Sequence, residues 1–381
     1  MSEWNLGALS DLAEIMMGQS PAGETCNADG NGLPLLNGPT EFGIKFPTPA
    51  QFTSDPKKIG EANDILFCVR GSTTGRMNWA DQKYALGRGL ASIRHKQGEE
   101  YRYFVKGVID YNLSMLLASA TGSTFPNISK DQLQELAILI PPLSEQKAIA
   151  NVLSSLDDKI DLLHHQNKTL ESMAETFFRQ WFIEEARDDW EDGTIADLID
   201  FNPLRKLSKG SVAPYLEMAS LNNSTFNPDD WYDRAFSSGT KFINRDTLLA
   251  RITPCLENGK TAYVTFLDKN QVGWGSTEYI VMRPKGELHP FFAYALARNT
   301  DFRAYAEGCL AGSSGRQRVE IQHLKNYVIK IPSQDIVSEF NSLAGSITAK
   351  LHSNFLQLRT LEKLRDTLLP KLMSGEVTVI I

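Results

Sequence analysis

Apolar residues recur with a helical period along two long stretches of the chain. In the first stretch the inward positions alternate between steps of four and three residues, the heptad pattern of a helix packed along another helix. These positions are Ile149, Leu153, Leu156, Ile160, Leu163, Asn167, Leu170, Ala174, Phe177 and Trp181. Asn167 therefore stands where a leucine would pack. The pattern predicts a rod of about 38 residues and about 55–60 Å.

Charged and polar residues fill the positions between the inward ones. They are Asp157, Asp158, Lys159, Asp161, Gln166, Lys168 and Glu171. We expect them to form a solvated face, because the side of a helix opposite its apolar stripe usually meets water.

The second stretch begins 191 positions later, where Ile331-Pro332 repeats Ile140-Pro141. Its inward positions keep the same alternation and are Phe340, Ala344, Ile347, Leu351, Asn354, Leu358, Leu361, Arg365, Leu368 and Leu372. We predict an antiparallel helix pair in which Asn167 and Asn354 fix the register, since a polar residue in such a seam costs stability and gives specificity. The alternative is a pair of leucine-rich core helices with incidental asparagines.

Shorter stretches also repeat between the two halves of the chain. The matched stretches are residues 4–12 with 190–198, 63–72 with 245–254, and 86–93 with 272–280. In the second match both patterns end in an arginine, Arg70 or Arg251. In the third, Gly87 and Gly89 form a G-x-G motif that we match with the one beginning at Gly273. The chain is therefore predicted to hold two diverged copies of one unit.

The predicted fold class is α+β, with two similar globular parts joined by two long helices in an antiparallel coiled coil and related by a pseudo-twofold duplication. The predicted boundaries are 1–142 for the first globular part, 143–184 for the first helix, 185–332 for the second globular part and 333–381 for the second helix. Short apolar runs bounded by turn residues predict strands within the globular parts. Residues 101–119 and 290–308 each predict one amphipathic helix.

Composition is that of an ordinary globular protein. Of 381 residues, 42% are hydrophobic and 22% are charged. The four cysteines form no C-x-x-C pair, which favours a reducing compartment. The N-terminal residues resemble no signal peptide and no run of 18 apolar residues occurs, so we expect a cytoplasmic protein with no membrane span.

The sequence carries no recognisable active-site motif. Residues 259–261 read Gly-Lys-Thr but lack the first glycine of a phosphate loop, and the Asn-Pro pairs lack the rest of an amino-methyltransferase motif. No dinucleotide fingerprint, zinc-protease motif or nuclease core is found. We therefore predict no catalytic residue, no cofactor and no metal in this chain.

Loops rich in arginine, small hydroxyl residues and amides are the main candidates for function. Such side chains suit phosphate oxygens and base edges, with Arg forking onto guanine and Asn or Gln onto adenine. The candidate DNA-binding residues are Arg70, Ser72, Thr73, Arg76, Arg88, Arg251, Asn258, Lys260, Arg316, Gln317 and Arg318. The alternative for each loop is an ordinary polar turn.

Net charge argues against strong DNA binding by this chain alone. The formal charge is −7, although residues 185–330 are close to neutral. Because phosphate contacts by Lys and Arg dominate affinity, we expect the isolated chain to bind DNA weakly and to need a more basic partner.

The order of globular part, helix, globular part and helix resembles the specificity subunit of type I restriction-modification systems. The resemblance covers essentially the whole chain and is strongest over the first long helix, from Pro141-Pro142-Leu143-Ser144-Glu145-Gln146 to its aromatic end. It implies two target-recognition domains, each reading one half of a split double-stranded DNA site, with helices that set the gap. Arg365 in the second seam departs from the more typical first helix.

The resemblance also implies partners that carry the chemistry. Methyltransferase subunits, two of them on this hypothesis, would dock on the helices, and restriction-translocase subunits would join through the complex. S-adenosylmethionine, ATP and Mg would belong to those partners. A different class of function is a non-catalytic coiled-coil scaffold with two protein-binding domains. A free-standing methyltransferase is a third possibility that the absent motifs disfavour.

Overall fold

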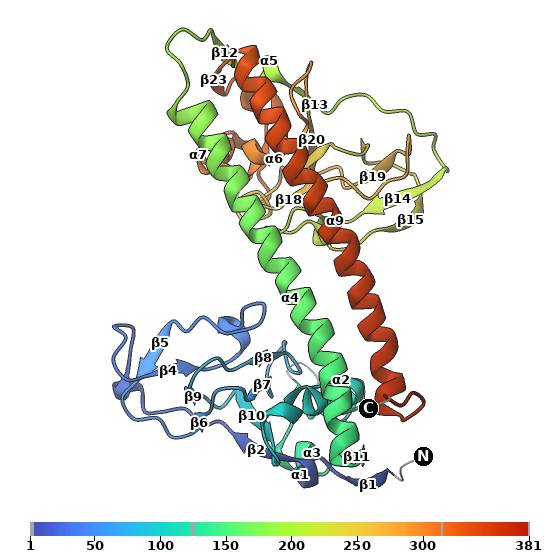
Figure 1. The fold of residues 1–381 in the computed structure, drawn as a ribbon. Helices are drawn as coiled ribbons and strands as arrows, with labels where there is room; N and C mark the ends of the chain where they lie inside the picture. The colour runs from blue at the N-terminus through green and yellow to red at the C-terminus, as the bar shows by residue number, and fades with distance from the viewer. Residues whose placement is uncertain (1–3, 123–125, 314, 380–381) are drawn as a thin grey trace. The chain divides into compact units, whose positions relative to one another are not determined.

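The computed structural model describes residues 4–122, 126–313 and 315–379 (Figure 1). Two compact units emerge, one drawn from Met1–Asp161 and Thr360–Ile381, called unit 1, and one from Leu162–Arg359, called unit 2. The long helices α4 (Leu143–Arg179) and α9 (Gln334–Met373) contribute residues to both units. The predicted fold class, with two α+β parts and two long helices, is confirmed.

The described residues of unit 1 form three sheets. The first is an antiparallel sheet in the order β2 (Ala13–Met17), β10 (Leu90–His95), β7 (Ile65–Cys68) and β8 (Met77–Trp79). The second has the order β3 (Cys26–Asn27), β5 (Gln51–Thr53), β4 (Leu33–Leu36), β9 (Tyr84–Leu86) and β6 (Ile59–Gly60), with β4 and β9 parallel. The third pairs β1 (Asn5–Ala8) with β11 (Ala137–Ile140). The helices are α1 (Leu9–Leu12), α2 (Arg102–Ser119) and α3 (Lys130–Gln134).

Unit 2 repeats this plan. Its first sheet has the order β13 (Ile199–Phe201), β20 (Tyr279–Pro284), β17 (Thr247–Ala250) and β18 (Thr261–Tyr263). Its second has the order β15 (Tyr232–Ala235), β14 (Val212–Leu216), β19 (Gly273–Gly275) and β16 (Thr240–Phe242), with β14 and β19 parallel. Two short pairs are β12 (Asp192–Thr194) with β23 (Val328–Lys330), and β21 (Leu310–Ala311) with β22 (Arg318–Val319). The helices are α5 (Ile195–Leu198), α6 (Phe291–Arg298), α7 (Thr300–Gly308) and α8 (Ile321–Leu324).

The repeat reaches the level of single hydrogen bonds. In unit 1, Asp11 at the start of α1 accepts a hydrogen bond from the Ala8 amide at 2.8 Å. In unit 2, Asp197 at the start of α5 accepts one from the Thr194 amide at 2.7 Å. A carboxylate there satisfies an amide that the helix leaves unpaired and complements the helix dipole. The matched aspartates of residues 4–12 and 190–198 are therefore capping residues.

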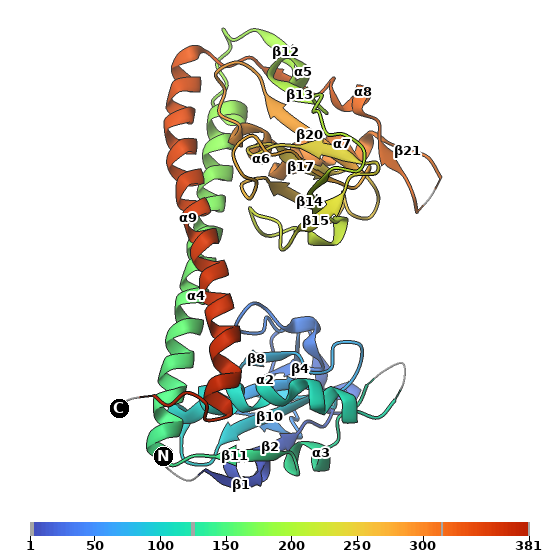
Figure 2. The same ribbon diagram turned by 90° about the vertical axis from the view of Figure 1, so that its right-hand side faces the viewer.

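The prediction of one helix over residues 290–308 is wrong. The stretch forms two helices, α6 and α7, and α6 lies on the first sheet of unit 2 (Figure 2). Asn299 between them is extended, with φ −64° and ψ 134°, and its side-chain oxygen accepts from the amides of Asp301 and Phe302. Asparagine at such a position starts a new helix, and this local capping interrupts the amphipathic pattern.

Both long helices belong to the hydrophobic core of each unit. In unit 1, Leu153 of α4 and Met373 of α9 are buried beside α2. A Cβ atom on Gly107 of α2 would lie 2.8 Å from Leu153 Cδ1, so glycine allows this close approach. Asp157 of α4 faces Arg365 of α9, with 3.5 Å between Oδ1 and Nη1. Because larger numbers on α4 meet smaller numbers on α9, the helices are antiparallel there.

In unit 2 the inward face differs from the predicted seam at the C-terminal end of α4 and in the π-helical turn Gln180–Glu184 that continues it. Phe178 and Phe182 are 0% and 2% exposed, whereas the predicted Phe177 is only partly buried. The ring of Phe182 packs against Phe292 of α6 at 5.0 Å and against Phe340 of α9 at 5.1 Å. The globular part thus supplies a second surface against which these rings pack. In addition, the inward face of a straight helix rotates slowly relative to a strict heptad repeat, so a seam counted in heptads becomes wrong towards the helix end.

The two asparagines of the seams meet inside unit 2. Asn354 is fully buried, and its Nδ2 donates to Oδ1 of Asn167 at 2.8 Å and to Oε1 of Gln166 at 3.4 Å. A buried amide needs such a partner, because an unpaired one costs about 1–3 kcal/mol. Together with the Phe182–Phe340 contact, this pair shows that larger numbers on the first helix again meet smaller numbers on α9, so the helices are antiparallel here as well.

Glu171 does not belong to a solvated face. This α4 side chain is 6% exposed, and its carboxyl accepts from Tyr294 Oη at 2.8 Å and from the Phe226 amide at 3.0 Å. Burial raises the pKa of Glu171 to about 7, against the opposing effects of the Tyr294 hydrogen bond and of nearby Arg298. The residue was misassigned because the heptad pattern describes only the contact between helices, while Tyr294 comes from the globular part.

The raised pKa of Glu171 predicts a stability that depends on pH. The folded carboxyl holds its proton more tightly than the unfolded one, so this stabilising contribution is complete below about pH 4.5 and is lost as the pH rises through about 7. Between about pH 4.5 and 7, urea unfolding should show that the free energy of unfolding falls less steeply for Glu171→Gln than for the wild type. The two slopes should differ by at most about 1.4 kcal/mol per pH unit. An exposed carboxyl of unit 2 that does not act on Glu171, Glu339 of α9, offers the control Glu339→Gln, which should keep the wild-type slope. Parallel pH profiles for wild type and Glu171→Gln would contradict the assignment.

Within the described ranges, no helix is both long enough and apolar enough to cross a membrane.

Candidate nucleic-acid interface

Three segments of unit 1 meet at Val69, directly after strand β7. The Val69 amide donates to the carbonyl of Gly89, in the loop between β9 and β10, at 2.9 Å. The Val69 carbonyl accepts from the amide of Ile128, which precedes α3, at 2.9 Å. The loop after β7, the β9–β10 loop and the segment before α3 therefore form one junction at the end of the first sheet.

The loop after β7 is held rigidly at this junction. Thr74 Oγ1 lies 2.8 Å from the Gly71 carbonyl and 2.9 Å from the Pro126 carbonyl, and the Gly71 amide donates to Pro126 at 3.1 Å. Gly71 has φ +104°, a conformation that favours glycine. Arg70 and Arg76 are exposed on this fixed base. Long cationic side chains on a rigid loop are well placed to contact a flat, charged partner.

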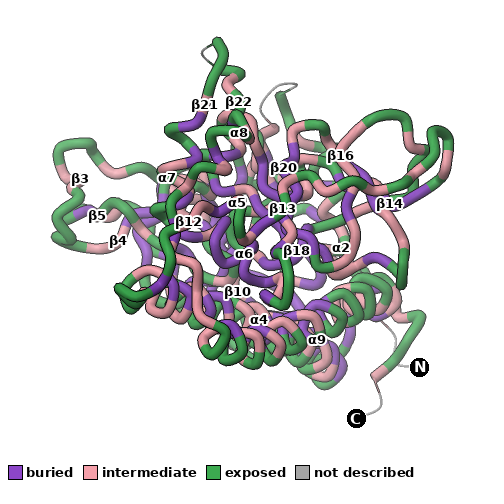
Figure 3. Tube along the Cα trace, turned by 90° about the horizontal axis from the view of Figure 1, so that it is seen from above, coloured by how far each residue is buried: buried purple, intermediate pink, exposed green. Residues whose placement is uncertain are grey.

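Unit 2 builds the same junction at Arg251, directly after β17. The Arg251 amide donates to the carbonyl of Glu278, between β19 and β20, at 2.9 Å, and its carbonyl accepts from the Val319 amide at 2.8 Å. Thr253 and Gln317 are linked twice, once from the Thr253 amide to the Gln317 carbonyl and once from the Gln317 amide to Thr253 Oγ1, each at 3.1 Å. The segments beside β21 and β22 are largely exposed (Figure 3).

These hydrogen bonds confirm one match made from the sequence and correct another. Residues 63–72 and 245–254 correspond one to one, which places Val69, not Arg70, at the position of Arg251, so the two arginines that end these patterns are not equivalent. Likewise Gly89 is the counterpart of Glu278, so the G-x-G motifs of the two halves are not equivalent. Apolar and glycine patterns alone could not fix the alignment to the residue, whereas the ladder register does.

The structure places the candidate DNA-binding residues in two groups. Seven side chains are exposed: Arg70, Ser72, Arg76, Arg88, Asn258, Arg316 and Arg318. Four are half-buried: Thr73, Arg251, Lys260 and Gln317. Arg251 Nη2 donates to the Val319 carbonyl at 3.0 Å and Lys260 Nζ to the Met218 carbonyl at 3.2 Å. Arg251 thus stabilises the backbone of the junction, Lys260 stabilises the segment at Met218, and the exposed group supplies the surface.

Four residues of the junctions escaped the sequence reasoning. They are Thr74, Asn127, Thr253 and Glu278. Asn127 pairs with Arg70 across an isolated bridge, and Arg318 pairs with Ile252 in the same way. Asn127 and Arg318 are thus counterparts. The sequence did place Thr74 in the glycine-bracketed loop. Its contact with Pro126, 52 positions away, could not be found from any local pattern.

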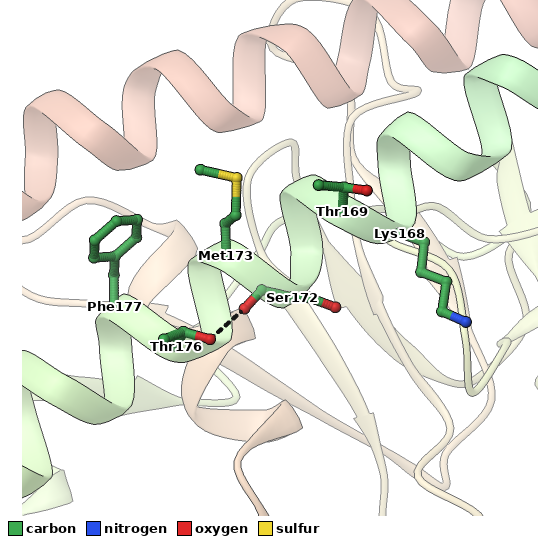
Figure 4. Close-up of a pocket in the computed structure, with 6 residues that line it drawn as sticks. All are labelled: Lys168, Thr169, Ser172, Met173, Thr176 and Phe177. Carbon is green, nitrogen blue, oxygen red and sulfur yellow. Dashed lines mark hydrogen bonds between the residues drawn. The ribbon is translucent and has the colours of Figure 1, made fainter.

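Each unit also has an apolar groove on the long helices. In unit 1 the groove is lined by the apolar residues Ala148, Val152, Leu156, Leu361, Leu364, Leu368 and Val379, with a rim of Ser144, Lys147, Asn151, Ser155 and Lys159. In unit 2 it is lined by Lys168, Thr169, Ser172, Met173, Thr176 and Phe177 of α4 (Figure 4). Leu364 and Met173 are 43% and 44% exposed and stand 191 positions apart, the offset of the repeat. The two grooves therefore include equivalent positions.

Among the described side chains, no group of three or more His, Cys, Asp or Glu is arranged to hold a metal ion.

Comparison with known proteins agrees with these features. A family model described as the type I restriction modification DNA specificity domain matches residues 1–172 and 187–353. The chain is 37% identical over 158 residues to the MjaX type I restriction enzyme specificity subunit of Methanocaldococcus jannaschii, a match that covers 42% of this chain and 37% of that protein. It is 25% identical over 424 aligned residues to the MjaIX type I restriction enzyme specificity subunit of the same organism, covering 99% of this chain and 94% of that one.

A solved structure has the same fold. The S subunit of the type I restriction-modification system from M. genitalium superposes with a TM-score of 0.61 at 18% sequence identity, covering 98% of this chain and 96% of that chain. The family model accounts for both globular parts, and the structural likeness extends over the helices between them.

Proposed function

Because the chain belongs to the family of type I restriction-modification DNA specificity proteins, we propose that it is the DNA-recognition subunit of a type I restriction-modification complex in the cytoplasm. Residues 1–142 and 185–332 serve as target-recognition domains, each reading one half of a split site in double-stranded DNA. Residues 143–184 and 333–381 are the spacer helices that set the gap between the halves.

The repeated junction is the observation that carries this proposal. In each unit three segments are fixed to one another by backbone hydrogen bonds, and exposed arginines stand on them. A duplicated reading surface suits a DNA site that consists of two separate halves. The exposed residues Arg70, Arg76 and Arg88 would serve one half-site, and Arg316 and Arg318 the other.

The partner subunits would carry out the reactions. Methyl transfer to adenine with S-adenosylmethionine would take place in methyltransferase subunits, and ATP- and Mg-dependent translocation and cleavage in restriction subunits. Partner subunits would also explain how a chain with a negative net charge can act on DNA. A chain of net charge −7 binds DNA poorly alone, and a basic partner supplies the missing phosphate contacts.

The two apolar grooves support docking of two methyltransferase subunits, one on each. Both grooves combine exposed apolar side chains with a polar rim, which is the usual composition of a protein interface. The Asn354–Asn167 hydrogen bond supports a fixed register for the helices that carry them, because a slip would leave the Asn354 amide buried and unpaired.

Charge introduced into one groove should remove one methyltransferase subunit. We expect the wild-type chain to bind two copies, and Leu364→Asp or Met173→Asp to bind one, because a buried unpaired carboxylate opposes docking. Native mass spectrometry of the reconstituted complex would count the copies. Leu162→Asp is the matched control, since Leu162 is 49% exposed on α4 and lines neither groove. Two copies on both groove variants would refute this assignment of the docking sites.

Selection from random double-stranded DNA tests the proposed function itself. The chain bound to its methyltransferase subunits should enrich two short half-sites separated by a fixed gap. The chain alone should enrich them weakly or not at all. Binding of the complex without any sequence preference would favour the alternative, a coiled-coil scaffold with two protein-binding domains.

A further inference from the structure

One exposed arginine of unit 2 has its side chain fixed by a carboxylate. Arg318 Nε donates to both carboxylate oxygens of Glu278 at 2.9 Å, and Nη2 donates to Oε1 at 2.7 Å. The two side chains are 46% and 21% exposed. The pair therefore lies at the surface of the junction, where a bound partner would reach it.

The backbone on both sides of this pair is anchored as well. The Glu278 amide donates to Ser276 Oγ at 3.1 Å, and the Glu278 carbonyl accepts from the Arg251 amide at 2.9 Å. Arg318 pairs with Ile252, and the next amide, Val319, donates to the Arg251 carbonyl at 2.8 Å. Both side chains thus start from one fixed segment, so the direction of the guanidinium is set before any ligand binds.

The geometry leaves a second edge of the guanidinium, between Nη1 and Nη2, available for another pair of acceptors. Glu278 occupies the edge formed by Nε and Nη2, so the donors of Nη1 and the remaining N–H of Nη2 point away from the carboxylate. Two parallel donors match O6 and N7 of guanine in the major groove. A DNA phosphate could also accept them, but the carboxylate makes the pair neutral overall and repels a nearby phosphate.

We propose that Arg318 reads a guanine in the half-site of unit 2 and that Glu278 is a positioning residue that aims it. This inference rests on the proposed function and names one base and the residue pair that selects it. Unit 1 carries Gly89 and Asn127 at the two equivalent positions, so the pair belongs to the second half-site alone.

Neighbouring Arg316 provides a contrast within the same segment. It is exposed, and in the described part of the chain it forms no ion pair. An arginine that is not held in one direction suits a phosphate contact. Arg316→Ala should therefore weaken binding evenly for all sequences and reduce the slope of log affinity against log salt by about one.

The experiment measures base preference at each position of the half-site with the reconstituted complex. DNA duplexes carry all four base pairs at every position, and their relative affinities are determined for wild type, Arg318→Ala, Glu278→Gln and Arg316→Ala. In the wild type one position should prefer guanine by about 5- to 150-fold. Arg318→Ala should abolish this preference at that position only, and Glu278→Gln should reduce it several-fold while the preferences at the other positions stay as in the wild type.

Other outcomes would overturn the inference in distinguishable ways. Equal weakening for every base pair in Arg318→Ala would make this residue a phosphate contact. Unchanged preferences in both variants, with normal unfolding curves, would make the pair a surface ion pair without a role in reading. A wild-type complex with no preference at any position would instead overturn the proposed function, and the inference with it.

Discussion

Adding one heptad to both long helices should widen the gap between the two half-sites by about three base pairs without changing the bases read. Seven residues extend a helix by about 10 Å, and successive base pairs are 3.4 Å apart. Duplicating residues 157–163 in α4 and 355–361 in α9 keeps the alternation of four and three in both seams. Some affinity should be lost, because three added base pairs also rotate one half-site around the DNA axis.

The modified adenines in host DNA report this change directly. Cells that carry the doubly extended chain should methylate the same two half-sites at the wider gap. A chain with the heptad in α4 alone is the control, and it should methylate neither site because its seams no longer match. Methylation at the original gap by the doubly extended chain would show that the helices do not set the spacing.

Replacing Asp246 should destabilise unit 2 by about 3 kcal/mol, because it leaves two half-buried guanidinium groups without their counter-charge. Asp246 is 0% exposed and precedes β17. Its carboxylate lies 2.8 Å from Arg283 Nε and 3.4 Å from Arg205 Nη2, and it accepts from the Ile243 amide at 2.8 Å. Asp246→Ala removes all three contacts at once.

Urea unfolding measures this loss, with an exposed ion pair of the same unit as control. Asp200 lies 3.6 Å from Lys285, and both side chains are largely exposed, so Asp200→Ala should change the free energy of unfolding by less than about 1 kcal/mol. An equally small effect of Asp246→Ala would mean that the arginines find other partners or water. Its counterpart in unit 1 is Asp64, which is 2% exposed and paired with Arg94 at 2.8 Å.

The long helices could be predicted from the sequence because their signal is local and repeated. Steps of four and three residues identify an inward face within two helical turns, and Asn167 and Asn354 stand out against it. The same pattern could not reveal Glu171. Its burial depends on Tyr294, which is 123 residues away in the chain and belongs to a sheet-bearing part.

The junctions were harder to predict because they depend on strand register. Arg70 and Arg251 look equivalent in the sequence, yet the hydrogen bonds match Arg251 with Val69. Glu278 and Arg318 are separated by 40 residues and meet only because β20 and β22 both lie beside the segment after β17. The loops themselves were identified by composition, whereas the partner that fixes each side chain required the fold.

The most direct measurement is long-read sequencing of host DNA with and without this gene, scoring modified adenines. We predict a split motif of two short half-sites with a fixed gap, present with the gene and lost on its deletion. Identical adenine modification in both strains, with the partner methyltransferase shown to be expressed, would contradict the assignment of this chain as the DNA-recognition subunit.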